Sequence, residues 1–292
     1  MILRATHTTT YSYADTVSIC YTEARLSPRS APGQNLVAHE LTIDPEPDSA
    51  LLRTDFFGNA VAAVSVQQPH RTLKITSQSI VETRDFEPIH PGLTPPWEQV
   101  CAAVNRHDNG DTFEAFQFVF ESPRVACLPE FAEYGRPSFP AGTPVLEGAL
   151  DLCRRIHADF KYNTAATTVT TPVGDALRAR QGVCQDFAHV MIACLRSLGL
   201  PARYVSGYLQ TGAGSVGVGA SHAWVAVYCS RFGWLDLDPT NDLMPSSKHI
   251  TLGWGRDYSD VPPVRGVALG GGEQKIAVEV LVTPTSSLSL SN

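Results

Sequence analysis

Three residues in the second half of the chain have side chains and settings suited to thiol chemistry. Cys184 is expected at the start of an amphipathic helix, His222 at the start of a strand, and Asp238 at the end of the next strand. A thiol nucleophile needs a base that takes its proton, and the base needs a group that orients it. The three residues therefore predict an acyl-transfer site with Cys184 as nucleophile, His222 as base and Asp238 as orienting group.

The position of Cys184 favours a reactive thiolate. Gly182 precedes it and lets the chain turn sharply into the helix. Free N–H groups and the helix dipole at a helix N-terminus stabilise a thiolate and can donate to an oxyanion. Taken alone, a cysteine is more often a small buried apolar residue, so Cys184 depends on its partners for this interpretation.

Spacing along the chain is expected to bring His222 and Asp238 together. Both lie eight residues from Ser230. A hairpin centred there would place them opposite each other, with Cβ atoms about 5 Å apart. Asp236 lies on the same face of the strand and is the alternative orienting group. His189 is rotated about 140° away from Cys184 on a helix, so we expect it to serve packing or to support the site without contacting the thiol, and a direct role is the lesser alternative.

Composition limits the classes of partner. The net charge of −7 disfavours a nucleic-acid partner or an anionic membrane surface. The seven cysteines are odd in number and never form a Cys-x-x-Cys pair, which is typical of reduced cytosolic thiols. No run approaches the roughly 18 apolar residues of a membrane span, and the first residues lack a signal sequence, so we expect a cytoplasmic protein.

No cofactor or metal is expected. The sequence contains neither a calcium-binding loop nor a set of zinc ligands with the usual spacing. A metal site built from Cys184, His189, His222 and Cys229 is a weak alternative for the same reason. The Gly-rich segment 211–220 precedes a strand instead of opening a helix, which excludes a nucleotide site. This segment is either a flap over the cleft or an ordinary surface loop.

Hydrophobic periodicity divides the chain into four parts. Residues 1–84 predict a β-sandwich-like module, 85–142 a connecting and partly helical segment, 143–270 the catalytic core, and 271–292 a strand with a frayed tail. The elements expected within these parts are strands at 8–17, 39–43, 60–66, 73–81, 202–209, 222–228, 233–238 and 274–283, and helices at 97–104, 112–120, 146–160, 173–180 and from 184 to about 198.

Several motifs resemble those of the bacterial transglutaminase-like superfamily. Residues 180–189, 221–225 and 234–241 are similar to its core motifs, 55–59 to its N-terminal β region, and 255–263 to its C-terminal signature. The resemblance implies an α+β fold in which the helix carrying the cysteine packs on an antiparallel sheet, as in papain-like enzymes, beside an N-terminal β-sandwich-like module. It also implies a Cys184–His222–Asp238 triad, and so favours Asp238 over Asp236.

Thiol peptidases, amidases and amine-transferring transglutaminases all occur in this family. We expect attack of Cys184 on a peptide or other amide, a thioester intermediate, and hydrolysis by water. Transfer to an amine and a non-catalytic binding module are the alternatives. The backbone N–H of Cys184 and either Tyr162 or Asn163 are candidate oxyanion donors, while Gln185 and Trp224 are candidates for supporting the site. The natural substrate and the oligomeric state are left open.

Overall fold

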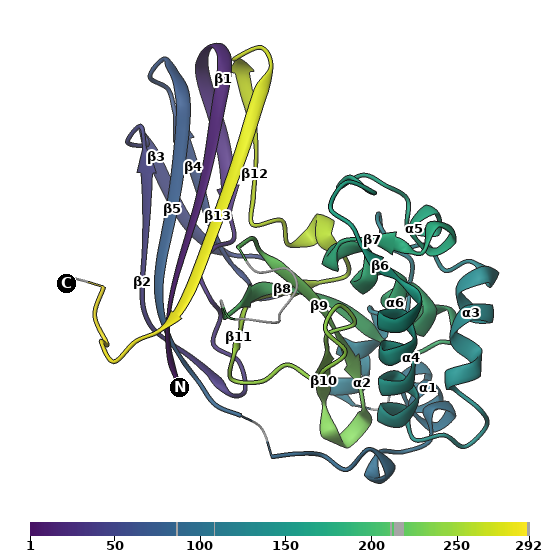
Figure 1. Ribbon diagram of the computed structural model, residues 1–292. Helices are drawn as coiled ribbons and strands as arrows, with labels where there is room; N and C mark the ends of the chain where they lie inside the picture. Colours follow the sequence, from purple (N-terminus) through teal and green to yellow (C-terminus); the bar gives the residue numbers. More distant parts are fainter. Residues whose placement is uncertain (86, 108, 211, 213–218, 291–292) are drawn as a thin grey trace.

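A tall antiparallel sheet and a smaller sheet covered by helices make up the chain (Figure 1). The computed structural model describes residues 1–85, 87–107, 109–210, 212 and 219–290. The architecture is α+β, as predicted. The first and last strands of the described chain both belong to the large sheet.

The longest strand of the large sheet, β1, is shared between two halves of the sheet. Its members are β1 (Ile2–Ala24), β2 (Gln34–Asp44), β3 (Ser49–Thr54), β4 (Ala60–Val66), β5 (His70–Thr83), β12 (Val264–Gly270) and β13 (Gln274–Pro284). The first half of β1 pairs with β5 and β13, and the second half with β4 and β12. Leu73 and Ile75 of β5 share a buried cluster with Val17 and Cys20 of β1. The two halves thus pack together as a sandwich, which confirms the predicted module.

The position of strand β12 differs from the domain boundaries expected from the sequence. Residues 264–270 were assigned to the catalytic core, but they pair with β1 in the large sheet. Positive φ values at Gly270, Gly271 and Gly272 let the chain reverse directly into β13. Because both strands of this hairpin remain on β1, the expected core segment ends before β12.

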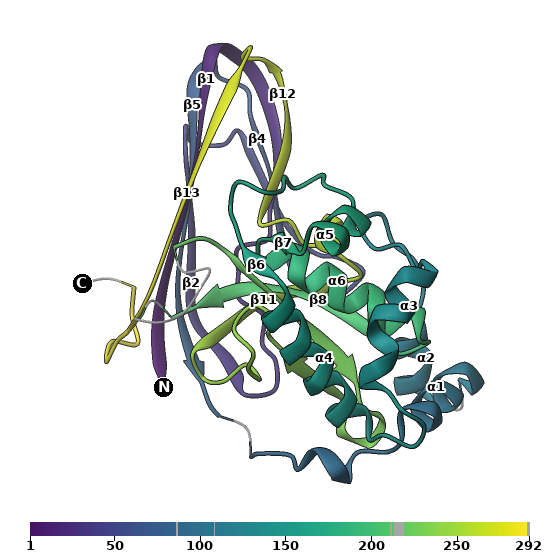
Figure 2. The ribbon, with the colours of Figure 1, turned by 45° about the vertical axis from the view of Figure 1, so that its right-hand side comes forward.

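The smaller sheet carries the central helix. Its strand order is β10 (Trp234–Leu237), β9 (His222–Tyr228), β8 (Ala202–Leu209) and β11 (His249–Gly255). The helices are α1 (Trp97–Arg106), α2 (Gly110–Phe116), α3 (Pro129–Gly135), α4 (Val145–Asp159), α5 (Val173–Ala179) and α6 (Cys184–Ser197). Figure 2 shows α6 beside β8, and it packs on both β8 and β9 while α3, α4 and α5 contact it. The predicted apolar stripe of α6 is buried, which places Cys184 at the edge of the core.

Most predicted elements are present, and the exceptions have separate causes. Helix α2 ends at Phe116 instead of 120, because Phe118 turns into the core. Strands β3, β11 and β12 and helix α3 lie outside the predicted elements. Every residue of β3 is exposed and β11 is almost wholly buried, so neither shows an alternating pattern. No helix in the described ranges is long and apolar enough to cross a membrane.

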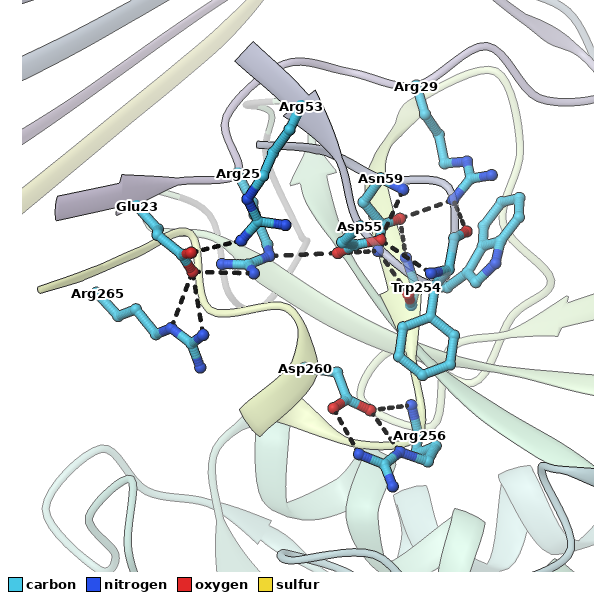
Figure 3. A network of polar contacts seen from close by, with 11 residues as sticks. Glu23, Arg25, Arg29, Arg53, Asp55, Asn59, Trp254, Arg256, Asp260 and Arg265 are labelled. Atoms are coloured by element: carbon cyan, nitrogen blue, oxygen red, sulfur yellow. Dashed lines mark hydrogen bonds and ion pairs between the residues drawn. The ribbon is translucent and has the colours of Figure 1, made fainter. Parts of the chain in front are cut away.

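The turn between β3 and β4 docks the large sheet on β11 (Figure 3). Asp55 Oδ1 accepts the backbone N–H groups of Phe57 and Asn59, at 3.0 and 2.9 Å. The Asn59 side chain then pairs with the backbone of Trp254, donating to its carbonyl at 2.9 Å and accepting from its N–H at 3.0 Å. Gly58 has positive φ, which suits a hairpin turn, and Asn59 is a buried docking residue.

A stack of arginines and tryptophans extends this junction into the smaller sheet. The Arg29 guanidinium lies 3.2 Å from the ring centroid of Trp254, and Arg203 lies 3.8 Å from that centroid. Arg203 also lies 4.4 Å from the ring of Trp234. Such cation–π contacts are strongest where water is excluded. Beside the junction, the Glu23 carboxylate forms ion pairs with Arg25, Arg53 and Arg265 (Figure 3).

Replacing Asn59 with Ala should destabilise the protein by about 2–3 kcal/mol, because the Trp254 backbone groups and Arg29 lose their partner. Urea denaturation measures this change. Phe56→Ala is the matched control, since Phe56 lies in the same turn but is 82% exposed. A loss below about 0.5 kcal/mol for Asn59→Ala, as expected for surface sites, would contradict the docking role.

Candidate active site

Cys184 begins α6 and is 8% exposed. The Asp186 carboxylate turns back and accepts the N–H of Val183 at 2.8 Å, which stabilises the start of the helix. A side chain at position 182 would collide with this carboxylate, because a Cβ there would lie 2.4 Å from Asp186 Oδ2. Glycine at 182 and aspartate at 186 together explain why the helix starts at the cysteine.

His222 and Asp238 meet in the interior. His222 Nε2 lies 2.7 Å from Asp238 Oδ2, and both side chains are fully buried. Trp234 pairs with Tyr228 and Leu237 with Val225, so the hairpin is centred on residue 231 instead of 230. The prediction that His222 and Asp238 lie directly opposite each other is therefore wrong.

The two residues come together in spite of this difference. The short 3₁₀ turn η3 (Ser230–Phe232) and Gly233, at φ 69°, shift the pairing. A shift of two residues leaves the same side chains on the same face, because side chains alternate along a strand. Asp238, one residue beyond β10, therefore reaches His222 diagonally.

The two ring nitrogens of His222 have different surroundings. Nε2 is taken by Asp238, and Nδ1 is buried without a hydrogen-bond partner among the described residues. Burial by itself lowers the pKa of His222, but its interactions with Asp238, and then with the nearby Cys184, outweigh burial and raise the pKa. The ring is thus close to Cys184 and its protonated form is favoured.

The Asp238 carboxylate has donors on both oxygens. Oδ1 accepts the N–H groups of Thr240 and Asn241, at 2.9 and 3.3 Å. Oδ2 accepts the Asn241 side-chain amide at 2.8 Å and faces His222. Burial raises the pKa of this carboxyl group, but His222, His249 and Asn241 outweigh that effect and hold it well below its usual range. Asp238 is therefore a stable anion at this site.

Asp236, the alternative orienting group, is used elsewhere. Its Oδ2 accepts the indole N–H of Trp224 at 3.0 Å. Trp224 is fully buried, and its ring centroid lies 6.1 Å from that of His222. Trp224 thus lies beside the histidine, as expected of a supporting residue.

The other candidate site residues, Tyr162, Asn163 and Gln185, have different surroundings. Burial, then the nearby Cys184, raise the pKa of Tyr162 to about 12, so its hydroxyl stays protonated next to the thiol. The Asn163 amide donates to Gln181 at 3.2 Å, and its oxygen accepts the N–H of Ala165 at 3.0 Å. Gln185 donates to the carbonyl of residue 169 at 3.4 Å, on the loop before α5. The Asn163 and Gln185 amides are thus engaged with neighbouring residues, whereas the Tyr162 hydroxyl remains a protonated donor.

His189 is a buried packing residue, and most of the Gly-rich segment lies outside the described residues. Burial lowers the pKa of His189 to about 4, and its Nε2 accepts the N–H of Tyr258 at 3.2 Å, so this neutral ring serves packing. Residues 211 and 213–218, the centre of the predicted flap, lie outside the described residues. The described chain contains no group of three or more His, Cys, Asp or Glu side chains arranged to hold a metal ion.

Three residues at the site were missed from the sequence. Asn241 follows Asp238 in a turn, and its Asp-Pro-Thr-Asn setting is the one signal that could have indicated it. Tyr204 on β8 is buried, and burial followed by the nearby Cys184 raises its pKa well above the usual value. His249 on β11 lies near Asp238, with no local pattern to mark it.

Comparisons with known proteins place this site in a family. A model of the bacterial transglutaminase-like N-terminal region matches residues 3–82, and a model of the transglutaminase-like superfamily matches residues 137–239. An uncharacterized protein of Mycobacterium tuberculosis is 42% identical over 297 residues, covering 96% of this chain and 92% of that protein. A protein-glutamine gamma-glutamyltransferase of Pseudomonas aeruginosa is 32% identical over 129 residues, covering 36% of this chain and 19% of that protein.

The fold has a solved counterpart. The crystal structure of a candidate cysteine protease from Cytophaga hutchinsonii superposes with a TM-score of 0.75 at 21% identity, covering 98% of this chain and 92% of that chain. The class is therefore a transglutaminase-like fold with a helix-borne cysteine on an antiparallel sheet. With the two family matches, the chain belongs to the transglutaminase-like superfamily and carries its bacterial N-terminal region.

The stability lost in Asp238→Asn should be greatest between about pH 4 and 6.5. Asp238 has a lowered pKa, so its contribution is present above the usual carboxyl pKa and is lost as the pH falls. His222 has a raised pKa, so its contribution is present below the usual imidazole pKa and is lost as the pH rises through the raised value. Urea denaturation of the wild type and the variant, from below about pH 4 to well above about pH 6.5, measures the difference.

The control for this experiment is Asp151→Asn, which alters a carboxylate with a 42% exposed side chain on α4. We expect it to change stability by less than about 0.5 kcal/mol at every pH. A loss for Asp238→Asn that is the same at all pH values would show that the pair is not ionised.

Proposed function

We propose that this protein catalyses acyl transfer from an amide through a thioester on Cys184, with water as the usual acceptor. The observation that carries the proposal is the buried His222–Asp238 pair, whose free Nδ1 is available to the thiol at the start of α6. A base held by a carboxylate next to a thiol at a helix N-terminus is the arrangement that activates a cysteine.

The proposed first step forms the thioester. His222 holds the thiol proton as imidazolium, and the Cys184 thiolate adds to the amide carbonyl carbon. The proposed donors to the resulting oxyanion are the backbone N–H of Cys184 and the Tyr162 hydroxyl, whose raised pKa keeps it protonated. Collapse of this intermediate breaks the C–N bond while His222 gives its proton to the leaving amine.

The proposed second step releases the acid. His222 takes a proton from water, the hydroxide oxygen adds to the thioester carbonyl, and the C–S bond breaks as the thiolate leaves. Asp238 stays ionised throughout and stabilises the imidazolium. A peptide or another amide is the proposed substrate class, and the steps above use only groups of this chain and water.

Transfer to an amine is the second candidate function. It is favoured by the Pseudomonas aeruginosa relative, a protein-glutamine gamma-glutamyltransferase that is similar over 36% of this chain. An amine in place of water in the second step would give transamidation with the same residues. We place hydrolysis first because water is always present, whereas transfer needs a second binding site to which none of the residues above is assigned.

Mass spectrometry of a glutamine-containing peptide incubated with the protein and a primary amine separates the two functions. We expect the free acid, a loss of at least about 10³-fold in Cys184→Ala, and normal rates in Cys101→Ala. A product that carries the amine in preference to the acid would overturn our order. Turnover in Cys184→Ala would contradict the thioester mechanism, and an intact thiol without any turnover of an amide library would favour a binding module.

Alkylation by iodoacetamide tests the activation of Cys184 without a substrate. We expect labelling of Cys184 well below the free-thiol pKa of about 8.5, and slower labelling near neutral pH in His222→Ala. Cys101 is the internal control, because burial raises the pKa of its thiol to about 11. Labelling that begins only near about pH 8.5, or that is unchanged in His222→Ala, would show that the thiol is not activated by His222.

A further inference from the structure

A second histidine lies beside the proposed catalytic carboxylate. His249, the first residue of β11, is 7% exposed. Its Nε2 lies 3.7 Å from Asp238 Oδ2, and this nitrogen has no hydrogen-bond partner among the described residues. Its ring packs edge-on against Trp224 with a centroid distance of 5.4 Å. Buried polar nitrogens are nearly always paired, so an unpaired one next to an anion calls for a role.

The tautomer of His249 can be read from its other nitrogen. The backbone N–H of Ser246 donates to Nδ1 at 3.2 Å, so Nδ1 is an acceptor. A neutral imidazole then carries its proton on Nε2, the nitrogen nearest Asp238. A shift of a few tenths of an ångström completes the hydrogen bond, and such bonds are often long before substrate binds.

The large sheet holds His249 in this position. Thr83, the last residue of β5, donates its hydroxyl to the carbonyl of Ser247 at 2.6 Å. Asp85 Oδ1 accepts the N–H of Ser247 at 2.8 Å. The His249 N–H donates to the carbonyl of Ser246 at 3.0 Å, which closes the turn. The turn that orients His249 is therefore anchored through both backbone groups of Ser247. Thr83 at the end of β5 binds the carbonyl, and Asp85 just beyond β5 binds the N–H.

We propose that His249 is a positioning residue for the proposed active site. Its Nε2–H is a further donor to Asp238 Oδ2 and keeps this carboxylate directed at His222. The proposal rests on the proposed function, because it assigns His249 a role in activating Cys184 through His222. The ionisable groups that face His249 are Asp238 and Asp236, next to and on β10, and His222 on β9.

Two substitutions distinguish the hydrogen bond donated by His249 from the packing of its ring. His249→Gln keeps a side-chain N–H at a similar distance from the backbone, whereas His249→Met fills the space without a donor. We expect His249→Met to slow iodoacetamide labelling of Cys184 about 3- to 10-fold at about pH 6, and to move the pH midpoint towards that of a free thiol. His249→Gln should stay within about twofold of the wild type, because it retains the hydrogen bond.

The control is His39→Met, the same exchange on β2 of the large sheet, which should leave labelling unchanged. Wild-type rates for both His249 variants would overturn the proposal. Equal slowing in both folded variants would overturn it as well, since ring packing and not the donor would then be responsible. Thermal unfolding of each variant identifies the folded ones.

A measurement on the wild type covers the case in which His249→Met does not fold. The ¹⁵N spectrum of the histidine rings should show neutral His249 protonated at Nε2, and protonation at Nδ1 would overturn the proposal. Failure of the proposed function has a different signature. Wild-type Cys184 would then label only near about pH 8.5, whatever the tautomer of His249.

Discussion

The burial of the Asp238 charge is the constraint around which the site is arranged. A carboxylate withdrawn from water is unstable unless hydrogen bonds replace its hydration. Here the turn after β10 supplies two backbone N–H groups and one amide, and β9 supplies an imidazole. These donors come from two elements, β9 and the turn after β10, so the charge is stable only when both elements are in place. The same charge raises the pKa of His222 and favours its protonated form.

The position of the Cys184 thiol depends on a separate, local set of contacts. Helix α6 starts at Cys184 because Asp186 caps the preceding N–H and because glycine at 182 leaves space for that carboxylate. The rest of α6 is buried against β8 and β9. Backbone capping thus sets the position of the sulfur, while sheet pairing sets the position of the imidazole. The packing of one helix on one sheet brings the two together.

Sequence reasoning reached the proposed site residues because each lies at the boundary of an element with a clear pattern. The hairpin register was two residues off, yet the pairing of His222 with Asp238 was predicted, since alternation along a strand has a period of two. His249 could not be predicted in this way. It belongs to a strand buried on both faces, and long-range contacts alone bring it to Asp238. The docking role of Asn59 could not be predicted either, since its contact with Trp254 joins segments 195 residues apart.

The pairing of β1 with β12 and β13 makes the helical part of the chain an insertion within a sandwich. Strands on both sides of this insertion share β1, so contacts that close the sandwich span more than 240 residues of sequence, such as that between Glu23 and Arg265. Closing so long a loop is slow, and the last strands leave the ribosome after everything they enclose. A ribosome-bound chain that lacks β12 and β13 therefore exposes both unpaired edges of its longest strand. Such edges are templates for pairing with other chains until the β12–β13 hairpin covers them.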